Sequence, residues 1–295
     1  MLMPARETAR LYTICHLPLD LPETDLLRPI NAERTDGENI AARRDWSELR
    51  AQYWVLKNTE LPDFVGFFHF RRYLDPAPKR GKRPYRTAER PDPAAYTAAV
   101  WRPILAEADI IAPRAEYTGL TVWERYAAYP NHDVRDLQTA VRVLCETRPA
   151  YTDAAERYLG GRREYYGNIY IMRSDLFRAY CEWLFPVLEA FRGERPQAGA
   201  RTEGYLAERL FGVWLTEQES NGGMRVKNLP RVHFTCYNDA AHRTTAFKKL
   251  LNFLLPCGSR VRGFFARLRL GKRARRALRG AGIDRYGERG ENLGS

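Results

Sequence analysis

Two spacings of apolar residues alternate along the chain. Short consecutive apolar runs predict buried strands, at 11–15, 63–70, 109–114 and 165–173, with a last strand region at 224–237. Apolar residues that return every three or four positions predict amphipathic helices, at 41–59, 94–108, 119–129, 134–161, 174–191 and 199–218. Residues 76–92 are rich in Pro, Lys and Arg and predict a loop. The alternation of strands and helices predicts an α/β layer fold with a mostly parallel central sheet.

Charge is distributed unevenly along this sequence. The 295 residues carry a formal net charge of +12, and eleven Lys or Arg with no Asp or Glu lie between residues 247 and 280. The rest of the chain is therefore close to neutral, which argues against a nucleic-acid cleft across it. This change in composition predicts a globular domain over residues 1–243 and a basic amphipathic helical tail over residues 244–295.

The tail interleaves its basic residues with Leu and Phe. Such a segment is typical of a helix that lies on an anionic membrane with its apolar side down. A disordered basic tail and a nucleic-acid-binding tail are the other interpretations, and the interleaved apolar residues favour the membrane.

Features that are missing from the sequence indicate where in the cell the protein lies. No apolar run is long enough to cross a bilayer, and the pattern of a signal peptide is missing from the first residues. Five cysteines without a C-x-x-C pair fit a reducing cytoplasm. We therefore expect a cytoplasmic protein that is peripheral on the inner face of the cell membrane.

The sequence FVGFFHFRRYLDP, residues 64–76, ends a predicted buried strand in a polar cluster. Ligands of open α/β sheets bind beyond the carboxyl ends of the strands, and two guanidinium groups there can hold a diphosphate by paired hydrogen bonds. Ordinary ion pairs at a surface strand end explain the cluster equally well on chemical grounds. Its polar residues are His69, Arg71, Arg72, Tyr73 and Asp75.

Three further positions are candidates for chemistry. Asn168 begins a predicted strand and offers an amide to a sugar hydroxyl, although a turn asparagine beside Gly167 is the more common role. Glu208, on a predicted helix, is a candidate general base, although most such residues are solvated helix charges. His16 ends the first strand, and the histidines show no metal-ligand spacing. The D-x-D pair with which many nucleotide-sugar transferases hold Mg²⁺ or Mn²⁺ is missing from the sequence.

Six longer motifs follow one another in a recognisable order: ICHLP, DGENIAARRDWSELRAQYWVLKN, DFVGFFHFRRYLD, VWERYAAYPNHDVRDL, YYGNIYIMRSDLFRAYCEWLFPVL and GYLAERLFGVWL. Over about residues 10–235 this order resembles the bacterial capsular and exopolysaccharide glycosyltransferase family long known only as domain of unknown function 4422. The sequence departs from the family pattern at Leu56, where Trp is usual, at Phe70, where Tyr is usual, and at Leu74, where Phe is usual. It retains the polar motif residues.

The resemblance implies a GT-A-like, Rossmann-type single domain that uses a nucleotide sugar. By motif position it implies Glu208 as the catalytic residue and a donor-binding set of His16, Glu48, Lys57, Asn58, His69, Arg71, Arg72, Tyr73, Asn168 and Arg209. Without D-x-D, Arg71 and Arg72 are expected to stabilise the charge on the departing UDP. Whether the protein also uses a divalent Mg²⁺ or Mn²⁺ stays open, and Asp75 is the reserve candidate for its ligand.

The expected function is transfer of a sugar from a UDP-sugar to a lipid-linked or oligosaccharide acceptor in capsule, O-antigen or exopolysaccharide synthesis. Some members of the family transfer galactofuranose, so UDP-galactofuranose is the first donor to test. The alternative from another class is a non-catalytic protein that binds nucleic acid or another polyanion, with strongly salt-dependent affinity. An inactive scaffold in polysaccharide assembly is the third interpretation.

Overall fold

The computed structural model describes residues 8–78, 83–237 and 258–283. The chain divides into two compact units, each assembled from separate segments. The first comprises Met1–Arg114, Tyr166–Cys181 and Gly223–Thr244, and the second comprises Ala115–Tyr165, Glu182–Gly222 and Thr245–Ser295. The domain boundary predicted between residues 243 and 244 lies outside the described residues and stays a prediction.

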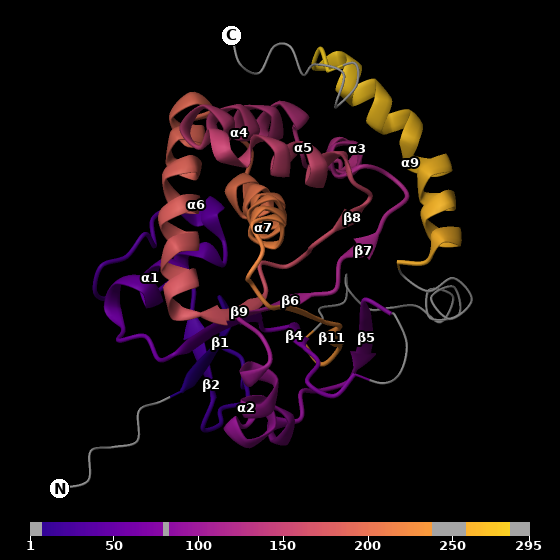
Figure 1. Cartoon of the computed structure of the whole chain (residues 1–295). Coiled ribbons are helices and arrows are strands. Elements are labelled where there is room, and N and C mark those ends of the chain that lie inside the picture. Colours follow the sequence, from indigo (N-terminus) through magenta and orange to yellow (C-terminus); the bar gives the residue numbers. More distant parts are fainter. Residues whose placement is uncertain (1–7, 79–82, 238–257, 284–295) are drawn as a thin grey trace, which may run out of the picture. The chain divides into compact units, whose positions relative to one another are not determined.

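In the first unit, the described residues form a nine-stranded sheet (Figure 1). The strands are β1 (Ala9–Cys15), β2 (Leu27–Asn31), β3 (Phe64–His69), β4 (Arg72–Leu74), β5 (Tyr85–Ala88), β6 (Ile110–Pro113), β9 (Tyr170–Arg173), β10 (Val226–Leu229) and β11 (Arg231–Phe234). The order is β10–β6–β9–β3–β4–β11–β5, with β1 beside β3 and β2 beside β1. All of these strands run in one direction except β4 and β9. The predicted α/β class and largely parallel sheet are therefore confirmed.

The two faces of this sheet are buried against different helices. Successive side chains on a strand point to opposite faces, so Phe67 and Phe68 enter separate cores. Phe68 packs into a cluster that includes residues of α2 (Ala98–Ala106). Phe67 packs against Phe177 of α6 (Ser174–Glu194), with ring centroids 5.2 Å apart. Burial on both faces is what a mostly parallel sheet requires.

Helices make up most of the second unit. They are α3 (Val122–Ala128), α4 (Val134–Thr147), α5 (Thr152–Gly160), α7 (Thr202–Ser220), α9 (Arg260–Gly280) and the second half of α6, beside a small sheet of β7 (Glu116–Tyr117) and β8 (Arg163–Glu164). Helix α9 confirms that the basic tail contains a helix, while residues 247–257 of that prediction lie outside the described residues. Among the described helices, none has the length and apolar character needed to span a bilayer.

Prolines and polar edge residues account for the main differences from the predicted elements. Pro149 opens a 3-10 turn that divides the helix predicted over 134–161 into α4 and α5. Pro230 lies between β10 and β11, which were predicted as one region. Strand β5 lies in the predicted loop 76–92; its pattern is polar because, among the described strands, it pairs with β11 alone at the sheet edge. The helix predicted over 41–59 begins only at Leu49, as α1 (Leu49–Asn58).

Candidate functional site

The carboxyl ends of β1, β3 and β11 meet at one edge of the sheet. Ile14 of β1 pairs with His69 of β3. His69 pairs with Arg72 of β4, which in turn pairs with His233 of β11. Directly paired residues point to the same face, so His69, Arg72 and His233 form a row across three strands. We call this row the carboxyl-edge row.

The ring of Phe70 gathers three of the predicted donor-binding residues. Phe70 and Arg71 form the tight turn between β3 and β4. The rings of His16 and His69 lie 5.6 and 4.3 Å from the Phe70 ring, centroid to centroid. The Arg71 guanidinium lies 5.2 Å from the same centroid, and the Arg71 backbone N–H donates to His69 Nδ1 at 3.2 Å. The end of β1 and the β3–β4 turn thus converge on one aromatic ring.

Arg72 and His233 differ from the ordinary ion-paired residues of this chain. Within residues 8–78, 83–237 and 258–283, no hydrogen bond or ion pair engages the partly exposed Arg72 guanidinium. Burial, followed by the positive charges of Arg231, Arg72 and Arg71, lowers the pKa of His233 to about 2. His233 therefore stays neutral at physiological pH, and its buried Nε2 has no hydrogen-bond partner in the described structure. This edge favours an anion and disfavours a further cation.

Arg231 stands beside this row on β11 and is 2% exposed. Its guanidinium lies over the rings of Tyr85 and Tyr166, at 5.8 and 5.6 Å, and donates to the Tyr166 carbonyl at 3.3 Å. The ring of His233 stacks on Tyr85 with centroids 4.2 Å apart. Neither Arg231 nor His233 was among the site residues predicted from the sequence. The signal was the R-x-H spacing in RVHF, which places both side chains on one face of a strand.

Helix α1 ties two further predicted residues to the same unit. Glu48, which precedes α1, has Oε1 3.6 Å from Nε2 of His69. One turn later, Gln52 Nε2 donates to the Asn168 carbonyl at 3.4 Å, and the Tyr170 hydroxyl donates to Gln52 Oε1 at 2.9 Å. Asn168 has φ +49° in the turn before β9 and is only 6% exposed. The turn role of Asn168 is thus observed, while its contact with a sugar stays a prediction.

Three predicted donor-binding residues are engaged elsewhere in the first unit. Asn58 Oδ1 accepts from the Glu38 N–H, and Asn58 Nδ2 donates to the Glu38 carbonyl, both at 2.8 Å. Lys57 Nζ lies 3.2 Å from Glu38 Oε1. Tyr73 is fully buried, and its hydroxyl accepts a hydrogen bond from Thr13 at 3.2 Å. These contacts hold a loop and a core in place. They give no support to a direct contact between the sugar donor and Lys57, Asn58 or Tyr73.

Asp75, the reserve metal ligand, is 1% exposed and bound to Arg86. Arg86 Nε donates to Oδ2 at 2.6 Å and Nη2 donates to Oδ1 at 3.3 Å. Both oxygens therefore have a cationic partner, which does not fit a metal ligand. In the part of the chain that the structure describes, no group of three or more His, Cys, Asp or Glu gathers for a metal ion.

Glu208 and Arg209 belong to the second unit, on α7. Arg209 Nη1 donates to Glu208 Oε2 at 2.8 Å and to the Tyr205 carbonyl at 3.1 Å. Arg209 Nη2 lies 2.8 Å from Oε1 of Glu164, a fully buried carboxylate on β8. Arg209 is therefore held by two carboxylates. For Glu208 to take a proton on Oε2, it must give up or share its contact with Arg209.

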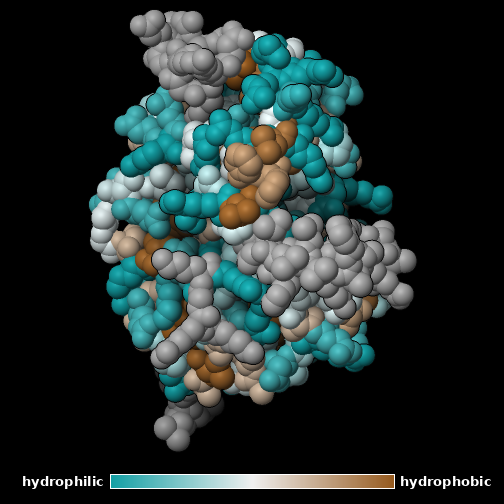
Figure 2. Space-filling model, turned by 90° about the vertical axis from the view of Figure 1, so that its right-hand side faces the viewer, coloured by the Kyte–Doolittle hydropathy of each residue, from teal (hydrophilic) through white to brown (hydrophobic). Residues whose placement is uncertain are grey.

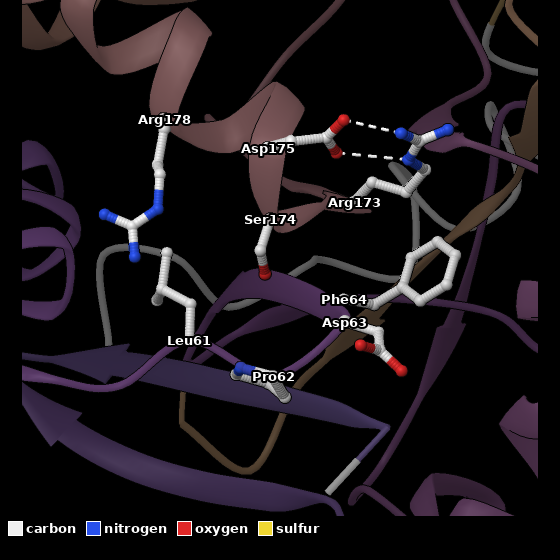
Figure 3. Close-up of a pocket in the computed structure, with 8 residues that line it drawn as sticks. All are labelled: Leu61, Pro62, Asp63, Phe64, Arg173, Ser174, Asp175 and Arg178. Carbon is white, nitrogen blue, oxygen red and sulfur yellow. Dashed lines mark hydrogen bonds and ion pairs between the residues drawn. The ribbon is translucent and has the colours of Figure 1, made fainter. Parts of the chain in front are cut away.

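A cavity of about 520 Å³ opens at the other edge of the sheet (Figure 3). It lies where β3 begins and where β9 runs into α6. Arg173 and Asp175 are paired there, with Nε 3.1 Å from Oδ1, and Arg178 projects from α6 apart from that pair. None of the predicted site residues lines this cavity, so the carboxyl edge remains the candidate functional site. The lining residues are Leu61, Pro62, Asp63, Phe64, Arg173, Ser174, Asp175 and Arg178.

Ligands of open α/β sheets bind beyond the carboxyl ends of the parallel strands, which is where these polar residues meet. The chain belongs to the family described as Domain of unknown function (DUF4422), which it matches over residues 10–219. Its fold is similar to the apo structure of WbbM, described as a bifunctional glycosyltransferase, with a TM-score of 0.70 and 24% sequence identity. The similarity covers 78% of this chain and 46% of the WbbM chain, so this chain spans a little under half of that protein. No curated protein matches the chain.

Proposed function

We propose that this protein is a glycosyltransferase that moves a sugar from a UDP-sugar to a lipid-linked glycan acceptor. The observation that carries the proposal is the carboxyl-edge row, in which the Arg72 guanidinium faces no carboxylate partner among the described residues. A planar guanidinium matches phosphate oxygens with two parallel hydrogen bonds. The fold shared with WbbM and the family membership support transfer rather than simple binding.

The transfer breaks the bond between the sugar anomeric carbon and the β-phosphate oxygen and forms a bond from that carbon to an acceptor hydroxyl oxygen. Negative charge grows on the departing UDP, and preorganised cations stabilise such charge most strongly. Arg72 and Arg71 take this role in our proposal, with His69 as a donor and the buried Arg231 adding positive potential. The proton of the acceptor hydroxyl goes to a base, for which Glu208 is our candidate.

The finer parts of the proposal come from the family resemblance. They are synthesis of capsule, O-antigen or exopolysaccharide, and UDP-galactofuranose as the first donor to test. Action on the inner face of the bacterial cell membrane, with residues 247–280 on the anionic lipid surface, is a further part of the proposal, and it comes from the basic and apolar composition of the tail.

The donor site is tested by UDP binding with Arg72→Ala. We expect UDP affinity to fall by about tenfold to a hundredfold, because a hydrogen bond to a charged group contributes about 1.5–3 kcal/mol. The matched control is Arg102→Ala, an exposed arginine on α2, which should leave the affinity unchanged. Equal affinity for wild type and Arg72→Ala would overturn the donor site.

The metal question is tested by sugar transfer in the presence of EDTA. Full activity in the chelator, lost in Arg71→Ala and Arg72→Ala, is the expected result. Abolition by EDTA would refute the idea that arginines replace the metal. Glu208→Gln separately tests the base and should lower kcat while UDP affinity is unchanged.

A further inference from the structure

Exposed apolar side chains gather on α9. Among the described residues, five large hydrophobic side chains are exposed, and four of them are on this helix. Val261, Phe264, Phe265 and Leu268 are 54, 57, 53 and 60% exposed. Their spacing of three, one and three residues places them on one face of a helix. Figure 2 shows a hydrophobic patch on this side of the molecule, bordered by hydrophilic residues.

Another side of α9 packs closely against the rest of the second unit. An added Cβ at Gly119 would lie 2.0 Å from the Gly263 carbonyl oxygen, and one at Gly263 would lie 2.5 Å from Cε1 of Tyr117. Gly271 and Ala274 continue the buried side along the helix. Because the helix backbone approaches the protein so closely, the rotation of α9 about its axis is fixed. The exposed face is therefore a fixed surface of the folded unit.

The charges on α9 select the kind of partner. The helix carries nine Lys or Arg and no Asp or Glu. Arg267 and Arg269 are exposed directly beside Leu268. An apolar face bordered by cations is the pattern of helices that lie in the surface of an anionic bilayer. Each Lys or Arg close to such a surface strengthens binding by about fivefold.

We infer that α9 is a lipid-docking helix, which lies along an anionic bilayer with Val261, Phe264, Phe265 and Leu268 among the headgroups and upper acyl chains. The binding itself follows from α9 alone. Its purpose, bringing the enzyme to a lipid-linked acceptor, rests on the proposed function. The bilayer contact is made by these four side chains of a helix that is fixed within the second unit.

The test is co-sedimentation of the full chain with vesicles of phosphatidylcholine, with and without phosphatidylglycerol. We expect binding to the anionic vesicles and a loss of roughly tenfold or more in the partition coefficient for the double variant Phe264→Ser/Phe265→Ser. The matched control is Leu17→Ser, the exposed apolar residue outside α9 (49% exposed), which should bind as wild type does. Thermal unfolding of each variant checks that the replacements leave the fold intact.

The electrostatic part is tested by Arg267→Glu/Arg269→Glu against Arg102→Glu. The first variant should lose binding to anionic vesicles by more than tenfold, and the second should not. Equal binding to neutral and anionic vesicles, or unchanged binding of the double Phe variant, would overturn the inference. Tight binding to a DNA fragment that depends on the arginines but not on the phenylalanines would also overturn it. UDP binding is measured in parallel, because a failed donor site leaves the vesicle result unaffected.

Discussion

The Arg209–Glu164 ion pair can be broken with little change of shape. Its Nη2 and Oε1 atoms are 2.8 Å apart, and the two side chains are 2% and 0% exposed. The change Glu164→Gln removes the negative charge and keeps nearly the same volume. Arg209 cannot lose its proton, so a positive charge would remain buried, with Glu208 at 2.8 Å as its carboxylate partner.

The expected cost follows from this geometry. Two unit charges about 4 Å apart attract by about 4 kcal/mol at an effective dielectric constant of about 20, and removal of one partner from a buried pair costs about 3–5 kcal/mol. Glu208 keeps its contact with Arg209 and offsets part of this loss. We therefore expect Glu164→Gln to lower the free energy of unfolding by about 3 kcal/mol.

Urea-induced unfolding, followed by circular dichroism, measures this cost. The matched control is Glu146→Gln on α4, because Glu146 is 52% exposed in its pair with Arg142. We expect the control to lose less than about 1 kcal/mol. The double variant Glu164→Gln/Arg209→Met should lose less than the two single variants summed. A loss for Glu164→Gln no larger than that of Glu146→Gln would refute the assignment of this pair as a buried support of the second unit.

Three further predictions follow from other contacts. Gly119→Ala should lower the unfolding free energy by roughly 2 kcal/mol or more, because φ is +76° there and the new Cβ would meet the Gly263 backbone. The control Gly280→Ala has open space around it and should be neutral or slightly stabilising in the same urea titration. Because the folded pKa of His233 is about 2, well below an unfolded value of about 6.5, the unfolded state binds the extra proton below that pH. The free energy of unfolding should therefore fall between pH 7 and pH 5. This fall should be about 2 kcal/mol smaller in His233→Gln than in wild type. Asp75→Asn should lower stability by about 1–3 kcal/mol through loss of its contact with Arg86 while UDP affinity is kept; weaker UDP binding with unchanged stability would make Asp75 a ligand contact.

Periodicity predicted the long elements of the fold because burial dictates them. Five of the six residues of β3 and six of the seven residues of β1 are buried, so both strands were found. Strands β2 and β5 have exposed residues at three of five and two of four positions. Their place in the sheet is decided by pairing with distant segments, and no local pattern reports such pairing.

Only the part of the candidate site that follows an apolar strand was predicted from the sequence. His69 and Arg72 were found because they follow a strongly apolar strand, and carboxyl ends of parallel strands are where ligands bind. Arg231 and His233 enter the same edge from β11, more than 150 residues later in the chain. Only the register of β4 and β11 brings these residues together, and register depends on tertiary packing.

The polar cluster of residues 69–75 serves two purposes, and strand geometry separates them. Because side chains alternate along β4, Arg72 shares a face with His233, whereas Tyr73 points into the opposite core and accepts a hydrogen bond from Thr13. Tyr73→Phe should therefore cost about 1 kcal/mol of stability and leave UDP affinity within about twofold of wild type. Arg72→Ala should do the reverse, since its guanidinium has no partner to lose among the described residues. A strong loss of UDP affinity in Tyr73→Phe at unchanged stability would show that the tyrosine, and not the arginine face alone, acts on the donor.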